Sequence, residues 1–201
     1  MDLINILLIA LSVFFALNMG GSGMAPSFSV AIGANIIKRR YAVILFTVFV
    51  CFGSLVFGKF VVKTLGSDLV PAENLDPLTV LIVIFSASSS LFLANILKIP
   101  QSTSWVTVFA ISAVGIYHSS LKTGTLLYKL LPAWILLPLF SFLLTLGILK
   151  AFYPLRAWNF RFYEYLSKHE FKMKIFVIAG SCYVAFAIGS NNVANIVRPL
   201  S

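Results

Sequence analysis

Six apolar stretches, each about as long as a membrane-spanning helix, follow one another along this chain with short links between them. A bilayer core needs about 20 apolar residues per helix. Only 10% of the residues are charged and 60% are apolar, which leaves too few charges to cover a water-facing domain. These features predict an all-α, polytopic membrane protein. The stretches cover residues 3–37, 41–60, 78–97, 99–117 and 126–149, and the sixth begins at residue 175.

The basic residues lie in short clusters between the apolar stretches. The positive-inside rule describes this distribution, so the net charge of +9 indicates topology and not nucleic-acid binding. The cluster at 38–40 is then cytoplasmic and the link that contains Asp68 is outside, which predicts a multi-pass protein of the cell membrane with its N-terminus outside. We expect a first transmembrane repeat at 1–149, a basic, aromatic, lipid-contacting cytoplasmic interfacial segment at 150–174, and the start of a second, inverted repeat at 175–201.

Three interruptions break the apolar pattern. Residues 20–23 are rich in glycine and precede Pro26, residues 189–192 read Gly-Ser-Asn-Asn, and Pro100 begins a polar run between the third and fourth stretches. Unwound backbone at membrane depth must line a cavity or be buried in protein, so the interruptions predict broken helices around a site. The third and fourth stretches form either two full crossings or a re-entrant helical hairpin. By contrast, the small residues at 53–58 indicate a helix-packing surface.

The two glycine-bearing interruptions resemble each other. Placing residues 20–25 on residues 189–194 aligns glycine with glycine, Met24 with Val193, and alanine with alanine. An odd number of crossings separates the two segments in either arrangement, so the second enters the membrane in the opposite sense. This pattern predicts inverted repeats, a recurring plan of transporters.

Three motifs carry a resemblance to a known family. Residues 189–195 read Gly-Ser-Asn-Asn-Val-Ala-Asn, residues 20–26 read Gly-Gly-Ser-Gly-Met-Ala-Pro, and residues 100–103 read Pro-Gln-Ser-Thr. The chain resembles the inorganic phosphate transporters of the PiT type, which include bacterial sulfate permeases. Their G-A-N-D-V-A-N signature is similar to the first two motifs, most closely to the copy at 189–195, and their hairpin element P-x-S-T is similar to the third. The resemblance implies a secondary transporter, a symporter or permease, of sulfate or phosphate.

An oxyanion that enters a membrane must exchange its hydration shell for protein donors. Helix N-termini supply backbone N–H groups and a positive dipole end, glycine allows close backbone approach, and hydroxyls and amides add neutral donors. The candidate anion-binding residues are therefore Gly20, Gly21, Ser22, Gly23, Ser102, Thr103, Ser104, Gly189, Ser190, Asn191, Asn192 and Asn195.

The aspartate of the family signature falls on Gly23 in the first copy and on Asn192 in the second. Hydrogen phosphate can donate its proton to a carboxylate, whereas sulfate is fully deprotonated near neutral pH and is repelled by one. The absent acids therefore favour sulfate over phosphate. They leave the coupling ion open: Na⁺ needs carbonyls, hydroxyls and amides, and H⁺ needs His118 or residues outside this sequence.

The sequence ends at Ser201, inside the second copy of the family pattern, and we interpret it as a fragment or truncated product. The alternative to a transporter is therefore a non-transporting membrane scaffold or a remnant of one. No metal-ligand cluster and no nucleophile–base pair is found, so we expect no enzyme, no catalytic residue, no metal site and no cofactor. The expected partners are an inorganic oxyanion and membrane lipid, with a homo-oligomer left open.

Overall fold

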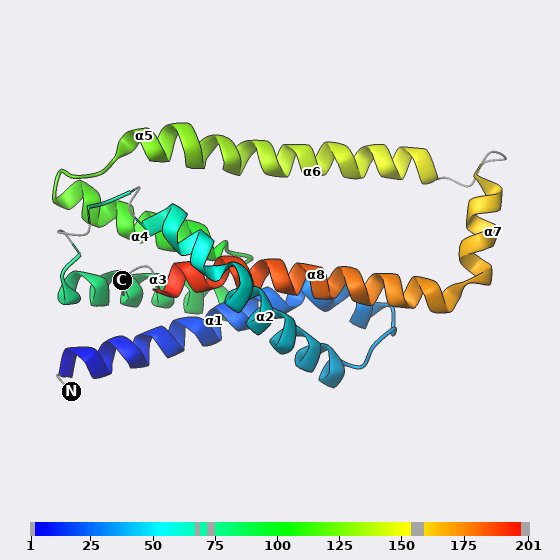
Figure 1. Cartoon of the computed structure of the whole chain (residues 1–201), viewed down its shortest axis with the longest axis horizontal. Helices are drawn as coiled ribbons and strands as arrows, with labels where there is room; N and C mark the ends of the chain where they lie inside the picture. The colour runs from blue at the N-terminus through cyan, green and yellow to red at the C-terminus, as the bar shows by residue number, and fades with distance from the viewer. Residues whose placement is uncertain (1–2, 67–68, 72–74, 154–158, 198–201) are drawn as a thin grey trace. The chain divides into compact units, whose positions relative to one another are not determined.

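The computed structural model describes residues 3–66, 69–71, 75–153 and 159–197 (Figure 1), and side chains are described in the same ranges except 59–66 and 193–197. Every regular element in these ranges is helical. Contacts divide the chain into unit 1 (Met1–Lys122 with Ile178–Ser201) and unit 2 (Thr123–Val177). The elements are α1 (Leu3–Gly33), α2 (Arg39–Gly66), α3 (Pro77–Ile96), α4 (Thr103–Tyr117), α5 (Thr123–Thr125), the π-helical turn η2 (Leu126–Leu130), α6 (Leu131–Phe152), α7 (Phe160–Lys168) and α8 (Glu170–Val197).

Five helical stretches among the described residues are long and apolar enough to cross a membrane. Large apolar side chains are widely exposed on them, and no residue of α6 is buried. Such extensive apolar surface fits a lipid environment and not water. The prediction of an all-α, polytopic membrane protein is confirmed. The five stretches are α1, α2 over Arg39–Gly58, α3, Thr123–Phe152, and α8 over Glu170–Asn192, while α4 is shorter at 15 residues.

The predicted break in the first apolar stretch is wrong. α1 is one continuous helix of 31 residues with Pro26 inside it, and no described glycine has a positive φ. Glycine costs a helix about 1 kcal/mol relative to alanine. An unsatisfied backbone group in lipid costs several kcal/mol, so the helix persists through the glycines.

The predicted break at residues 189–192 is also wrong, because α8 continues through them. Gly189 instead lets α8 approach α2: a Cβ there would lie 2.7 Å from the carbonyl carbon of Val50. A Cβ on Gly53 would likewise lie 2.9 Å from the carbonyl carbon of Phe186. Ser54 joins the two backbones, since its Oγ donates to the oxygens of Val50 (2.8 Å) and Gly189 (3.0 Å). Small residues thus allow close helix packing, as predicted for 53–58.

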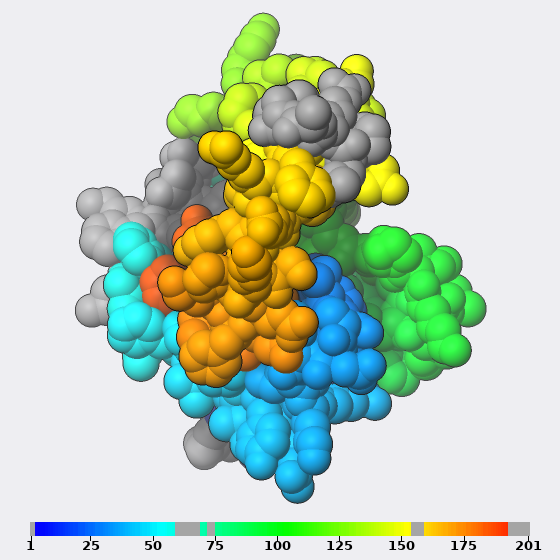
Figure 2. Space-filling view, turned by 90° about the vertical axis from the view of Figure 1, so that its right-hand side faces the viewer, coloured from blue at the N-terminus to red at the C-terminus, as the bar shows by residue number. Residues whose placement is uncertain are grey.

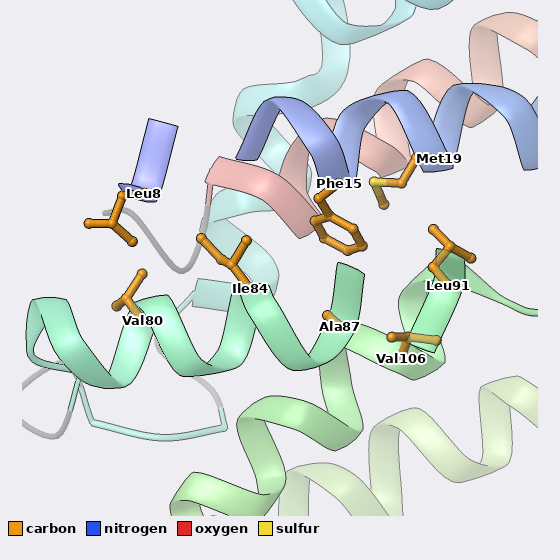
Figure 3. Close-up of a cluster of buried hydrophobic side chains, with 8 residues drawn as sticks. All are labelled: Leu8, Phe15, Met19, Val80, Ile84, Ala87, Leu91 and Val106. Atoms are coloured by element: carbon orange, nitrogen blue, oxygen red, sulfur yellow. The ribbon is translucent and has the colours of Figure 1, made fainter. Parts of the chain in front are cut away.

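The main hydrophobic core of unit 1 lies between α1 and α3 (Figure 3). Leu8 lies beside Val80 and Met19 beside Leu91, and the equal spacing of the two pairs means that the helices run in the same direction. The described part of α8 in unit 1 runs in the direction opposite to α1 (Figure 1). This is the direction expected if residues 189–195 begin an inverted copy of the segment at 20–26. The cluster consists of Leu8, Phe15, Met19, Val80, Ile84, Ala87, Leu91 and Val106.

α3 and α4 form a hairpin that turns at the level of the middle of α1. Asn95, close to the end of α3, donates from Nδ2 to the backbone oxygen (3.1 Å) and the side-chain oxygen (3.2 Å) of Asn18. Asn18 is the central residue of α1. At the base of the hairpin, the N–H of Lys122 donates to the oxygen of Leu69 (3.0 Å). The Ser/Thr segment at the tip therefore lies about halfway along α1.

The turn after α3 contains a lysine in the left-handed region. Lys98 has φ of 57°. Its N–H donates to the backbone oxygen of Asn95 (3.3 Å), and the N–H of Ile99 donates to the backbone oxygen of Ala94 (2.9 Å). This is the Schellman pattern, which ordinarily has glycine at the left-handed position. A residue with a Cβ pays about 1–2 kcal/mol there.

Lys98→Gly is expected to stabilise the protein by about 1 kcal/mol, because glycine adopts positive φ without that cost. The measurement is the apparent Tm in detergent, which should rise by about 2–4 °C. Asn35→Gly is the matched control: Asn35 has φ of 54° in the corresponding turn after α1, and asparagine tolerates this region. A larger rise for Asn35→Gly than for Lys98→Gly would contradict the explanation.

One end of unit 1 is basic. Lys38, Arg39 and Arg40 are exposed where α1 turns into α2. In Figure 2 the α1–α2 connection, in light blue, lies at the lower edge of the view. The basic side chains from which a cytoplasmic face is predicted are thus exposed at this end of unit 1.

Unit 2 consists of the long helix Thr123–Phe152, α7 and the first turns of α8. α7 folds back on the end of α6: the ring of Phe162 lies 4.8 Å from that of Phe152, and Nδ2 of Asn159 donates to the oxygen of Phe152 (3.0 Å). Lys168 pairs with Glu164 at 2.7 Å on the exposed side of α7. The segment that the sequence predicts to lie at the membrane interface thus carries both aromatic and charged side chains.

Candidate anion site at the hairpin tip

A cavity of about 380 Å³ lies where the tip of the α3–α4 hairpin meets α1 and α8. All of its walls belong to unit 1. The volume is within the range of small-ligand pockets. The lining residues are Met19, Ser22, Gly23 and Pro26 from α1, Gln101, Ser102, Thr103 and Ser104 from the tip, and Tyr183, Val184, Ala187, Ile188, Asn191 and Asn192 from α8.

Two side-chain hydrogen bonds join the tip to α8. Nδ2 of Asn191 donates to Oγ of Ser104 (2.9 Å), and Oγ1 of Thr103 donates to Oδ1 of Asn192 (3.2 Å). The two asparagines of the signature-like motif therefore meet the hydroxyls of the P-x-S-T element, although the two motifs lie nearly ninety residues apart. These contacts hold four polar groups at one wall of the cavity.

The N-terminus of α4 supplies the electrostatic character of this wall. Ser102 is the N-cap, with extended backbone, and its Oγ accepts from the N–H of Trp105 (3.4 Å). The other N–H groups of a first helical turn have no partner within the helix and carry the positive end of its dipole. No acidic side chain lies in the first turn of α4.

Another part of the lining comes from α1, which contributes Ser22 and Gly23. Oγ of Ser22 donates to the oxygen of Met19 (3.0 Å) within its own helix. A Cβ on Gly23 would lie 3.1 Å from Cγ2 of Ile188 and 3.3 Å from the ring of Phe46. Glycine at this position lets α1 and α8 approach each other beside the cavity.

The lining of the cavity has no charged side chain. The acids Asp76, Glu164 and Glu170, which belong to the described residues, are not part of this lining. The cavity thus combines a positive helix end with neutral hydroxyls and amides. This combination suits an anion and gives a cation no carboxylate ligand.

The structure brings most, but not all, of the predicted anion-site residues together. Gly20 and Gly21 face open space on α1, Gly189 packs on α2, and Oγ of Ser190 donates to the oxygen of Ala187 (2.8 Å) outside the lining. Asn195 belongs to α8, but its side chain lies outside the described residues. The residues that line the cavity are Ser22, Gly23, Ser102, Thr103, Ser104, Asn191 and Asn192.

Sequence reasoning missed several lining residues. Met19, Pro26, Gln101 and Tyr183 also line the cavity. Gln101 could have been predicted from the sequence, because it is polar and lies inside the Pro-Gln-Ser-Thr element. The other three have no feature that distinguishes them from ordinary residues of a membrane helix.

The membrane-length helices define this chain as an integral membrane protein, and unit 1 holds an uncharged cavity lined in part by hydroxyls and amides at a hairpin tip. The chain belongs to the phosphate transporter family, which residues 19–201 match. This confirms the family resemblance, and it also confirms that the protein is not an enzyme.

The relatives include permeases for two oxyanions. The chain is 40% identical to the sulfate permease CysP of Bacillus subtilis over 96% of its own length, which is 53% of the relative. It is 30% identical to a putative phosphate permease of Pyrococcus furiosus over 67% of its length and 35% of the relative, and 27% identical to one of Thermococcus kodakarensis over 72% and 38%. The chain thus spans about half the length or less of these relatives. No solved structure matches the chain.

Proposed function

We propose that this chain forms the oxyanion-binding part of a secondary transporter that carries sulfate, or else phosphate, across the cell membrane. The observation that carries the proposal is the cavity at the hairpin tip, where the N-terminus of α4 and neutral donors face a space without a carboxylate. Family membership and the sulfate permease relative support the same substrate class.

Sulfate fits this cavity better than hydrogen phosphate. Sulfate offers only acceptors, and hydroxyls, amide N–H groups and helix N–H groups donate to all of them. Hydrogen phosphate also has a proton to donate, and the lining has no carboxylate to receive it. The acceptors of the lining are neutral oxygens such as Oδ1 of Asn192, which already accepts a hydrogen bond from Thr103.

The geometry supports a mechanism in which the hairpin is re-entrant and its tip moves relative to α8. The bonds from Asn191 to Ser104 and from Thr103 to Asn192 close the tip onto α8 in this structure. An oxyanion that binds between them replaces both bonds with charge-assisted ones. Rocking of one repeat against the other then exposes the site alternately, with the N-terminus outside and the basic α1–α2 connection inside.

Cation coupling is part of the proposal, with Na⁺ or H⁺ as the ion. Hydroxyl and amide oxygens suit Na⁺, whereas the cavity lining has no titratable carboxylate for a proton. A Na⁺ gradient and a pH gradient, each imposed alone on proteoliposomes, distinguish the two ions.

Uptake and binding of labelled sulfate test the function. We expect the purified chain in proteoliposomes to take up sulfate saturably, and detergent-solubilised chain to bind sulfate roughly tenfold more tightly than phosphate, a difference of about 1.4 kcal/mol. Empty liposomes and the variant Asn191→Leu, which removes the bond to Ser104, are the controls. Absence of both uptake and binding, with either anion, would sink the proposal and support the alternative of a non-transporting scaffold.

A further inference from the structure

Gln101 occupies a position that the family motif does not explain. It precedes the N-cap Ser102 and lines the cavity at the hairpin tip. It also lines a second cavity of about 670 Å³ between α3 and α4, which Ser90 and Trp105 help to form. Gln101 is therefore one of the residues that line both spaces.

The amide of Gln101 is only half satisfied. Its Nε2 donates to Oγ of Ser90 (3.0 Å), whereas its Oε1 is buried and has no hydrogen-bond partner among the described residues. Buried side-chain oxygens without a partner are rare in proteins, so each one needs an explanation. A missing ligand is one such explanation.

Reversal of the amide changes what it offers to a ligand. The oxygen and the NH₂ group of glutamine exchange places when the last side-chain torsion turns by half a revolution. A serine hydroxyl both donates and accepts, so Ser90 holds the amide in either orientation. In the reversed orientation Oε1 accepts from Ser90, and Nε2 has free N–H groups that need an acceptor.

The surroundings decide between a cation and an anion as that ligand. A cation on Oε1 would lie near the positive end of α4, beside a cavity lined without any carboxylate. An oxyanion would be attracted by the same helix end and would accept from the reversed amide. We propose that Gln101 is an additional oxyanion ligand, which donates from Nε2 in the reversed orientation while Ser90 anchors its Oε1. This inference rests on the proposed function.

Sulfate binding to the purified chain, measured by equilibrium dialysis of labelled sulfate, tests the role of Gln101. Gln101→Leu should raise the Kd about tenfold, since it removes one charge-assisted hydrogen bond to the anion and such a bond contributes about that much affinity. Gln101→Glu should raise the Kd further by repulsion. Ser90→Ala should change the Kd less than Gln101→Leu, and Ser190→Ala, outside the cavity lining, should not change it.

A purely structural role predicts a different result. If Gln101 only ties the tip to α3, then Gln101→Leu and Ser90→Ala lower the apparent Tm equally and leave the Kd unchanged, which would overturn the inference. Gln101→Met, similar in length and flexible, repeats the test if the leucine variant does not fold. Wild-type chain that binds neither sulfate nor phosphate overturns the proposed function itself, whereas tight binding with an unaffected Gln101→Leu overturns only the role of Gln101.

Discussion

Gly189→Val is expected to destabilise unit 1 by about 3 kcal/mol, at the upper end of the cost of overpacking. The added Cβ would lie 2.7 Å from both the carbonyl carbon and the Cα of Val50, and backbone atoms cannot move aside as a flexible side chain can. α8 must then separate from α2, which also breaks the bond from Ser54 to Gly189. The apparent Tm in detergent measures the loss, and Gly53→Val should show a similar one.

Gly20→Ala is the matched control for the packing prediction. Gly20 lies in the interior of α1 with open space around it, so a methyl group meets nothing and improves helix propensity by about 0.5–1 kcal/mol. Its apparent Tm should rise slightly. If Gly20→Ala and Gly189→Val shift the Tm in the same direction, close packing of α2 and α8 is not the reason for the glycine at 189.

Asn192→Asp is expected to weaken sulfate binding by more than 100-fold. The variant keeps the shape of the side chain and its contact with Thr103 but adds a negative charge to the cavity lining. Two unit charges about 5 Å apart repel by roughly 3 kcal/mol at an effective dielectric constant of 20, and sulfate carries two charges. Phosphate should lose less affinity, because hydrogen phosphate donates its proton to the new carboxylate.

Labelled sulfate and phosphate binding to the purified variants measures this difference. Asn192→Leu is the control: it removes the bond with Thr103 without adding charge, so it should weaken both anions about equally. Equal losses of sulfate affinity in Asn192→Asp and Asn192→Leu would show that the charge at position 192 does not determine selectivity.

Much of the fold follows from the length of the apolar stretches. Among the described residues, five of the six stretches appear as helices of membrane length, the fourth appears as the shorter α4, and the polar run that begins at Pro100 falls in the turn between α3 and α4 and the start of α4. The depth of that turn does not follow from the sequence, because it depends on the long-range bond between Asn95 and Asn18. Whether stretches three and four form a re-entrant hairpin or two full crossings is therefore a question of tertiary contact.

Glycines show where sequence reasoning reaches its limit. Packing is predicted at Gly53 and a helix break at Gly189, yet both residues allow the same close approach of α2 and α8. A glycine that bends a helix and a glycine that lets a neighbour approach look identical in one sequence. A lipid environment favours the glycine that lets a neighbour approach, because an unbroken helix forms all the hydrogen bonds of its own backbone.

The candidate site is only partly predictable for a similar reason. Hydroxyls at Thr103 and Ser104 and amides at Asn191 and Asn192 follow from donor chemistry and from the motifs, and the structure brings them together. Gln101 enters the lining through its place in the turn, which periodicity does not reveal.

The hydroxyl of Ser22 bonds to the carbonyl of Met19 in its own helix, and this has a consequence for the kinetics of ligand exchange. The carbonyl lies within an unbroken helix, so its loss of the serine bond leaves no backbone group stranded in lipid. Under the proposed function, Ser22 is therefore an additional donor: its hydroxyl turns to an arriving oxyanion and returns to the oxygen of Met19 when the anion leaves. Loading and emptying the cavity at this wall then requires only a rotamer change, which is fast compared with any movement of helices.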